Sequence, residues 1–181
     1  GDTSDTSDFG IWPTDPALLS GDAPALWTIE VVSVLPHDAD SYTQGLELAG
    51  DVLVESRGRY GKSEIRLVDP TTGDIRASTA LRKNEFGEGA TVVGSTIIQL
   101  TWKAEVAYVW SLADLTLLDQ FGYIGEGWGL CAQPDRLVMS NGSSTLTFRD
   151  PTDFQPLGTV DVTQNGSPVP FLNELECVDG F

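Results

Sequence analysis

The stretch GEGWGL, residues 125–130, places an acid and a tryptophan between three glycines, directly before an apolar run. Related settings recur, each with a chemically capable residue beside a glycine or leucine: Gln44, Glu88, Trp128 and Glu174. A carboxylate can take up and return a proton, an amide can orient a polar group through hydrogen bonds, and an indole can pack against a substrate. Neighbouring glycines let backbones crowd and leave room for a ligand. These positions predict a site, provided that the fold brings them together.

An internal repeat indicates that it does. The segments 43–56, 87–100, 127–140 and 173–181 align in one register. Their shared column holds Gly45, Gly89, Gly129 and Leu175, at intervals of 44, 40 and 46 residues. A period of about 40–45 residues with four short strands per unit is typical of a β-propeller. The aligned strand comes first in each unit, so we place it next to the axis.

The residue before that column then lies at one mouth of the central channel in every blade. The alternative is that these residues serve only turns and packing between blades. A core built only for packing would not place Gln, Glu, Trp and Glu in four equivalent positions. We therefore favour a ring of functional side chains. The segments VDPTTGD (68–74) and RDPTDF (149–154) become equivalent hairpins between the two outer strands.

Short runs rich in β-branched and aromatic residues supply the strands. They are 28–35, 51–56, 63–69, 95–100, 105–112, 136–140 and 144–148. Turn sequences such as PTTGD, PDR and NGS separate them. No segment keeps helical periodicity for three turns. The sequence therefore predicts an all-β domain.

Composition narrows the partners and the compartment. The chain has 181 residues with 10 basic and 27 acidic side chains, a formal net charge of −17. Such acidity repels phosphate backbones, so we expect no nucleic-acid partner, and no apolar run is long enough for a membrane span. Residues 1–27 read as a polar N-terminal arm, and 28–181 as part of a single propeller domain. The arm is similar to the polar leader that follows a removed signal peptide, so we expect a secreted or periplasmic protein.

Metal and thiol chemistry have little support in the sequence. The only histidine is His37, which we interpret as a loop residue with local hydrogen bonds, and the usual zinc sites need more ligands. Cys131 and Cys177 fall in one column of the repeat, on neighbouring inner strands. A disulfide is therefore conceivable if their Cα atoms approach within about 7 Å, and two free buried thiols are the alternative.

Three motifs are misleading. SRGRYGKS (56–63) imitates a phosphate-binding loop but has Ser56 in place of the first glycine and a strand after it. GEGWGL fails as a dinucleotide fingerprint because no helix follows. The NGS triplets at Asn141 and Asn165 match the N-glycosylation pattern, but Asn-Gly is also a common hairpin turn, which we favour.

One family shares these features in the same order. The segments PHDADSYTQGL, ESRGRYGKSEIRLVDPTTG, FGEG, QLTWK, GEGWGL, MSNGSSTL and PVPFLNELE together resemble the glutamine cyclotransferases, the plant and bacterial type of glutaminyl-peptide cyclase. The resemblance runs from about Val31 to Phe181. It implies a five-bladed propeller that closes an N-terminal Gln to pyroglutamate and releases ammonia. It also implies no cofactor and no metal.

The family's motifs map onto single positions of this chain. The family's FTQGL corresponds to YTQGL here, with Tyr42 in place of the usual Phe, and FGEG places Glu88 at the catalytic acid. The remaining matches are Gln44, Phe86, Trp102, Trp128 and Asn173. We expect Glu88 to act first as base and then as acid. Its pKa would be lifted by apolar neighbours.

The other roles follow from physical arguments. Gln44 and Asn173 can bind the substrate amide and backbone, while the tryptophans pack on its side chain. The repeat alone suggests that Glu174 and Glu126 hold the α-ammonium group. Two other classes compete with this interpretation: a non-catalytic propeller that binds peptides or glycans, and a calcium-dependent propeller hydrolase such as a lactonase.

The blade count predicts a further partner besides the peptide or protein substrate with N-terminal Gln. At ~45 residues per blade, the chain supplies about three blades and the start of a fourth. The family also uses a Trp and a Lys downstream of these residues. We expect a C-terminal fragment of the same precursor, roughly 70–90 residues long on this period, to complete the propeller and supply them.

Overall fold

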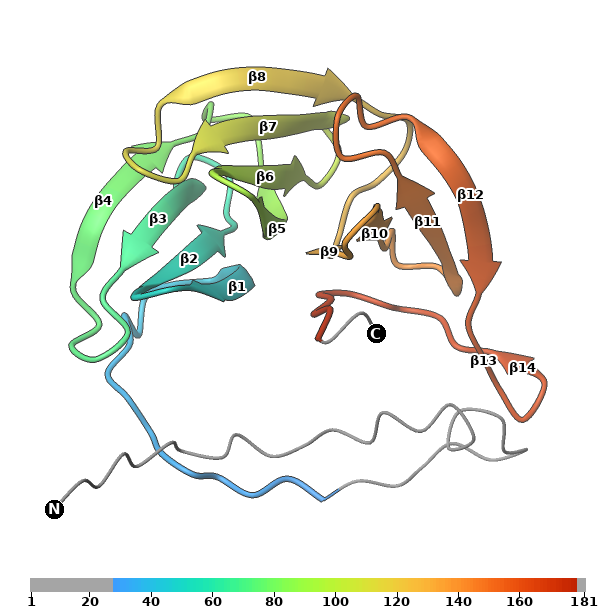
Figure 1. Ribbon diagram of the computed structural model, residues 1–181, viewed down its shortest axis with the longest axis horizontal. Helices are drawn as coiled ribbons and strands as arrows, with labels where there is room; N and C mark the ends of the chain where they lie inside the picture. Colours follow the sequence, from blue (N-terminus) through green and yellow to red (C-terminus); the bar gives the residue numbers. More distant parts are fainter. Residues whose placement is uncertain (1–27, 179–181) are drawn as a thin grey trace, which may run out of the picture.

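The computed structural model describes residues 28–178, so the predicted polar arm at 1–27 lies outside the described residues. Three four-stranded antiparallel sheets form the body of the molecule (Figure 1). The first contains β1 (Thr43–Ala49), β2 (Val52–Arg57), β3 (Glu64–Val68) and β4 (Ile75–Ala80). The second contains β5 (Gly87–Val93), β6 (Thr96–Thr101), β7 (Val106–Ser111) and β8 (Leu117–Gly122). The third contains β9 (Leu130–Ala132), β10 (Leu137–Met139), β11 (Thr145–Arg149) and β12 (Pro156–Asp161), and a small hairpin of β13 (Thr163–Gln164) and β14 (Ser167–Pro168) follows.

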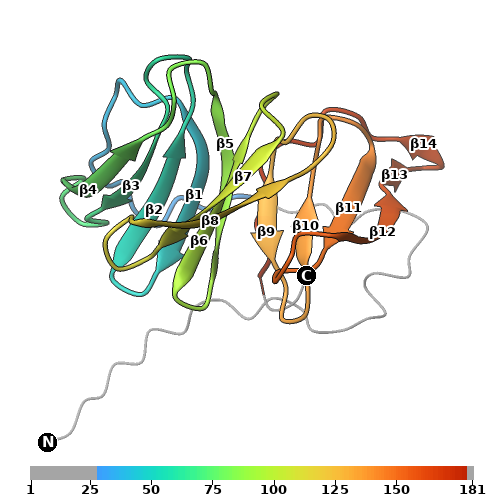
Figure 2. The same cartoon turned by 90° about the horizontal axis from the view of Figure 1, so that it is seen from above.

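The sheets are propeller blades. Each runs in chain order from the inside to the outside, and Figure 1 shows the three fanned in an arc with β1, β5 and β9 innermost. Seen from above, the blades stand side by side with their faces packed together (Figure 2). The all-β prediction and the placement of the aligned strand next to the axis are both confirmed. The described chain forms three blades, followed by a segment beside β9.

Close approach of the inner strands explains the aligned glycines. The amide of Gly89 donates to the carbonyl of Trp128 across the blade interface, at 2.7 Å. A Cβ added to Gly89 would stand 2.7 Å from the nitrogen of Leu130, and one added to Gly45 would stand 2.7 Å from the nitrogen of Ala90. Any side chain there would force the blades apart.

Strand alternation divides the core between two interfaces. Adjacent residues of β6, Ile97 and Ile98, point to opposite faces of blade two and enter different hydrophobic clusters. Ile97 joins the cluster shared with blade one, and Ile98 joins the cluster shared with blade three. Each fully buried apolar side chain of this size contributes roughly 1.5–3 kcal/mol. Packing against both neighbouring blades therefore stabilises blade two.

The predicted outer hairpins form as expected. The side-chain oxygen Oδ1 of Asp69 accepts hydrogen bonds from the amides of Thr71 and Thr72, and Asp150 accepts one from Thr152 in the same way. Asn165 has a φ of 52° in the turn between β13 and β14. The preference for a turn at this NGS triplet is thus confirmed.

Three predictions differ from the structure. Residues 28–35 form no strand, and their apolar side chains are exposed, Ile29 by 95%. A strand needs a ladder partner, and the described residues provide none for this segment. The segment after Leu172, predicted as a fourth inner strand, also lacks strand pairing among residues 28–178. His37 lies in a loop as predicted, but its hydrogen bond is not local, because its Nε2 lies 3.0 Å from Oε1 of Glu55 on β2.

No helix within residues 28–178 has the length and apolar character needed to cross a membrane. The stretch SRGRYGKS is followed by strand β3, as expected for a sequence that only imitates a phosphate-binding loop.

Candidate active site

A pocket of about 320 Å³ opens at the inner end of the blades. Its lining residues are Tyr42, Gln44, Phe86, Glu88, Trp102, Trp128 and Asn173. These are the predicted site residues with the exception of Glu174, and they come from all three blades and from the segment after β14. The fold therefore brings together side chains that are up to 131 positions apart in the sequence.

Glu88 is the buried acid of this pocket. It lies on β5 with only 5% exposure, and its Oε2 accepts a hydrogen bond of 2.6 Å from Nε2 of Gln44. Burial raises the pKa of Glu88 to about 8 against the opposing effect of the Gln44 hydrogen bond, and the negative charge of Glu126 adds to the rise. No cation forms an ion pair with Glu88 within the described chain. The group can therefore exchange protons near neutral pH.

Buried polar residues hold the backbone of Glu88 in place. Ser56 donates to the carbonyl oxygen of Glu88, and Gln99 donates to Ser56 at 2.8 Å. Trp110 in turn donates to Oε1 of Gln99 at 3.0 Å. Sequence reasoning missed this relay. A signal existed, because Ser56 and Ser140 share one position of the repeat alignment. Ser140 likewise donates to a backbone carbonyl, that of Asn173.

Aromatic rings form the apolar wall. The ring of Phe86 meets Tyr42, Tyr60 and Trp102 edge-on, with centroids 6.1, 5.4 and 5.8 Å away. Gly58 makes room for Phe86, because a Cβ there would stand 2.2 Å from the ring. Tyr42, Phe86 and Trp102 line the same pocket as Glu88, the carboxyl whose pKa is raised by burial.

Glu126 fixes the two tryptophans of the pocket. Its Oε2 accepts hydrogen bonds from the indole nitrogens of Trp102, at 2.7 Å, and Trp128, at 3.0 Å. Lys103 approaches Oε1 at 3.3 Å and also lies over the ring of Trp102. The hydrogen bonds from Trp128, Trp102 and Lys103 lower the pKa of Glu126. Glu126 is thus the shared hydrogen-bond acceptor of both indoles, a contact that the repeat did not predict.

Glu174 lies beside this pocket and not in its lining. Its carboxylate faces Gly45 and Gly89, in an adjoining recess that also contains Gln44 and Glu176. Glu174 is an exposed residue, but desolvation of its carboxyl group and the charges of Glu176 and Glu88 raise its pKa to about 9. It is a second acid that can hold a proton near neutral pH.

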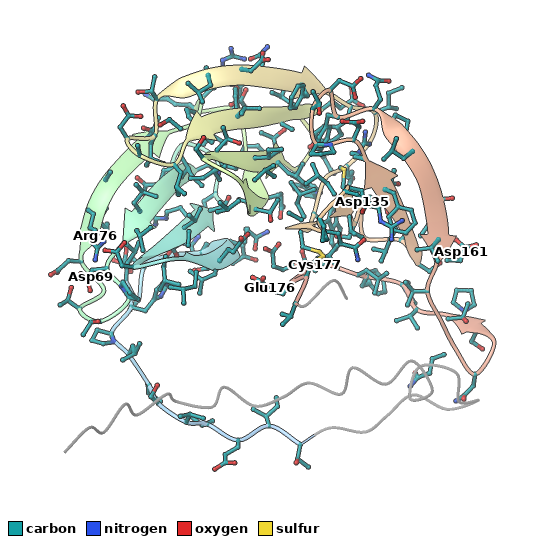
Figure 3. The ribbon with its side chains drawn as sticks, in the orientation of Figure 1. Asp69, Arg76, Asp135, Asp161, Glu176 and Cys177 are labelled. Atoms are coloured by element: carbon teal, nitrogen blue, oxygen red, sulfur yellow. A yellow bond between two sulfur atoms is a disulfide. The ribbon has the colours of Figure 1, made fainter. Side chains whose placement is uncertain are left out.

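A disulfide fixes the segment that carries Asn173 and Glu174. Cys131 on β9 is bonded to Cys177, with their Cα atoms 5.4 Å apart, which resolves the two alternatives for these cysteines. Figure 3 shows Cys177 and Glu176 on the segment along the inner edge of the arc, far from the Asp69–Arg76 pair on an outer hairpin. Within residues 28–178, no three His, Cys, Asp or Glu side chains gather in a way that could hold a metal ion.

Two solved structures show different degrees of similarity to this chain. A crystal structure of Myxococcus xanthus glutaminyl cyclase superposes with a TM-score of 0.78 at 34% identity, over 83% of this chain and 64% of that one. The WD40 domain of Neurospora crassa Pan2 superposes with a TM-score of 0.56 at 9% identity, over 66% of this chain and 36% of that one. The second likeness shows the propeller fold alone.

Sequence comparison gives a narrower result. A glutaminyl-peptide cyclotransferase of Arabidopsis thaliana is 39% identical over 153 residues, which make up 83% of this chain and 48% of the relative. The chain thus spans about half the length of that curated relative. The model of the glutamine cyclotransferase family matches residues 9–181. The chain therefore belongs to the glutamine cyclotransferase family.

Proposed function

We propose that this chain carries the catalytic pocket of a glutaminyl-peptide cyclotransferase, an acyltransferase that converts the N-terminal Gln of peptides or proteins to pyroglutamate. The observation that supports this best is Glu88: a buried carboxyl in an aromatic pocket, with one amide donor and a pKa of about 8. The Arabidopsis and Myxococcus relatives, both named for this activity, support the same reaction.

In this mechanism Glu88 transfers one proton twice. Its carboxylate accepts a proton from the substrate α-ammonium group, and the freed amine attacks the side-chain carboxamide carbon and forms the five-membered ring. Glu88 then gives this proton to the departing nitrogen and the bond from the carbonyl carbon to that nitrogen breaks. The remaining extra proton of the ring nitrogen passes to the released ammonia, which leaves as ammonium. The overall reaction needs no net proton from the enzyme.

The pKa of Glu88 suits this task. A free α-amino group has a pKa of about 7.7–8.0, so proton transfer to Glu88 is close to isoenergetic. An exposed glutamate, with a pKa of about 4.3, would make the same transfer unfavourable by about 5 kcal/mol. Burial of the carboxyl group therefore makes Glu88 a stronger base and removes most of the energetic cost of this proton transfer.

Orientation supplies the rest. Ring closure is intramolecular, so holding the amine against the carboxamide is a large part of catalysis. Gln44 and Asn173 can bind the amide and the backbone of the substrate, while Trp102 and Trp128 enclose its side chain. We propose that Glu126 acts through these indoles, and that Glu174 lies near the α-ammonium group.

A coupled ammonia assay with a Gln-dipeptide, run with and without a chelator, tests this function. We expect one ammonia per pyroglutamate and no loss of rate with chelator. Binding of the dipeptide without ammonia release would indicate a non-catalytic peptide-binding propeller. Loss of activity on chelation would indicate a metal-dependent reaction and contradict the role given to Glu88.

We also propose that further blades complete the propeller and that the protein acts in an oxidising compartment, secreted or periplasmic. The exposed apolar side chains of residues 28–35 and the unpaired segment beside β9 support the first proposal. The Cys131–Cys177 disulfide supports the second. Mass spectrometry of the denatured natural protein would reveal a companion fragment of the same precursor, and a single uncleaved chain would contradict the predicted fragment.

A further inference from the structure

A second cavity lies between blades two and three and shares no residue with the Glu88 pocket. Its volume is about 360 Å³, and it is lined by Gly122, Tyr123, Ile124, Arg149, Phe154, Gln155 and Pro156. These residues come from the end of β8 and from the hairpin that joins β11 to β12. The cavity therefore opens toward the outer part of the blades, away from the channel.

Arg149 occupies a position where the blade repeat uses apolar residues. It pairs with Pro156 directly after an irregularity in the β11–β12 register. The same irregularity precedes Val68 in blade one and Trp110 in blade two. Both of those side chains are buried in the core. The fold thus has no general need for a cation here.

The guanidinium group of Arg149 is buried without a neutralising carboxylate. The residue is 8% exposed and lies over the rings of Phe154, at 4.7 Å, and Tyr123, at 5.6 Å. Nη1 donates to the carbonyl of Phe154 at 2.9 Å, and Nε contacts the sulfur of Met139 at 3.0 Å. The remaining nitrogen, Nη2, makes no hydrogen bond to residues 28–178. It is not one of the fully buried side-chain atoms that lack a hydrogen-bond partner, so it keeps some exposure. It is open to the cavity.

The buried arginines of blade one have carboxylate partners, which Arg149 lacks among the described residues. Arg57 lies 2.8 Å from a carboxylate oxygen of Glu64, and Arg66 lies within 2.8 Å of both Asp38 and Glu64. Arg149 forms no such ion pair in the described part of the chain. Burial lowers its pKa, which reflects the unfavourable energy of an isolated buried charge. An anion in the cavity would relieve this energy.

We propose that this cavity binds a small monocarboxylate with an apolar body. Its carboxylate accepts hydrogen bonds from Nη2 of Arg149, and its body packs among Tyr123, Phe154 and Pro156. A ligand with one negative charge matches the guanidinium group of Arg149, which has one open edge. The formal net charge of −17 repels anions of higher charge. The aromatic and aliphatic lining favours an organic acid over an inorganic ion.

Calorimetric titration of the intact protein with benzoate tests the proposal. We expect saturable binding of one benzoate per chain, and at least ~10-fold weaker binding of uncharged benzyl alcohol, the scale of one charge-assisted hydrogen bond. Arg149→Leu, which restores the apolar character of the repeat position, is expected to weaken benzoate binding at least ~10-fold. Arg136→Leu is the matched control, because Arg136 also stacks on a ring of blade three, at 4.2 Å from Phe148. It should leave binding unchanged.

Gln155→Glu gives an independent test if Arg149→Leu does not fold. Gln155 lines the cavity and is exposed. The new carboxylate should therefore form an ion pair with Arg149 and reduce benzoate binding without disturbing the core. Equal binding by benzoate and benzyl alcohol, unchanged binding by Gln155→Glu, or no saturable binding would each overturn the proposal. So would binding that survives Arg149→Leu but disappears in Glu88→Gln, because the benzoate would then occupy the catalytic pocket.

Discussion

Two buried glutamates on neighbouring blades have opposite environments. Glu55, on β2, is 1% exposed and accepts hydrogen bonds from the hydroxyls of Ser41 and Thr43. His37 lies 3.0 Å from the same carboxylate, and Arg66 lies 3.6 Å from it. Burial by itself raises the pKa of Glu55, but these hydrogen bonds and charges outweigh it, and the pKa is lowered.

Glu88, 5% exposed on β5, has one amide donor, and its pKa rises to about 8. The difference shows that depth of burial does not decide the charge of a carboxyl group. The number of donors and cations that face it decides. Glu55 holds the segment containing His37 and Ser41 against blade one, whereas Glu88 is left ready for proton transfer.

The largest expected effect is a loss of activity without a loss of stability when Glu88 is replaced. Glu88→Gln should lower kcat/KM for Gln-peptides at least ~10²-fold, because a general acid–base group is lost. The variant should be no less stable than the wild type, because no ion pair is broken and the buried carboxyl with its raised pKa is removed. Steady-state kinetics and thermal unfolding measure the two quantities. If the variant retains wild-type turnover, another residue must transfer the proton, and Glu174 would be tested next.

Glu55→Gln should show the reverse pattern. Removing one member of a buried, hydrogen-bonded ion network costs about 3–5 kcal/mol, because Arg66 loses a neighbouring charge while it stays buried. We expect the free energy of unfolding to fall by roughly 3 kcal/mol, with kcat changed less than about twofold in the protein that remains folded. Urea denaturation checks the first value. A stable but inactive variant would contradict this division of roles.

The two glutamates should also give opposite pH dependences of stability. The lowered pKa of Glu55 stabilises the fold above the unfolded pKa, and this contribution is lost as the pH falls through the folded value. The raised pKa of Glu88 stabilises the fold at low pH, and this contribution is lost as the pH rises toward about 8.

The free energy of unfolding, measured at pH 5 and pH 9, tests the pH dependence predicted for Glu88. Each pKa unit corresponds to about 1.4 kcal/mol, so the wild type should lose about 2 kcal/mol or more relative to Glu88→Gln across this range. Glu174, with a pKa of about 9, acts in the same direction in both proteins, and the loss of the Glu88 charge in the variant reduces its contribution there. The same pKa of Glu88 predicts that kcat/KM rises with pH up to about 8. A profile that is flat from pH 6 to pH 9 would exclude Glu88 as the base.

The smallest expected effect concerns the support of the pocket. Glu126→Ala removes the common acceptor of the two indoles, and a hydrogen bond to a charged group is worth about 1.5–3 kcal/mol. We expect KM to rise about 10-fold with a smaller change in kcat, together with altered tryptophan fluorescence. Glu105→Ala is a suitable control, because Glu105 accepts from the amide of Gly125 in the same loop but touches neither indole. A collapse of kcat with KM unchanged would instead indicate a direct chemical role for Glu126.

Sequence reasoning predicted the site residues that belong to the repeat or to a family motif. Gln44, Glu88 and Trp128 precede the aligned glycines, and a rotational repeat converts a shared sequence position into a shared position around the axis. The glycines were predictable for the same reason, because equivalent inner strands approach one another in the same way at every blade interface. Asn173 came from the family motif alone.

Contacts outside the repeat were not predictable. The bond from His37 to Glu55 and the isolated cation at Arg149 follow no repeat. For the relay from Trp110 through Gln99 to Ser56, the alignment offers only the match between Ser56 and Ser140. Residues 28–35 have the composition of a strand, but a strand also needs a partner in space, and composition does not contain that information.

The sequence by itself determined the all-β blades and the inner strands of the three described blades, and it predicted that Gln44, Glu88 and Trp128 lie together, because strand alternation and the repeat are properties of neighbouring and equivalent residues. The tertiary structure alone decided which carboxyl is neutralised and which is not, and whether Cys131 meets Cys177. Both depend on distances of a few ångströms between residues that are far apart in the sequence, and those distances are set by how strands, loops and blades pack together.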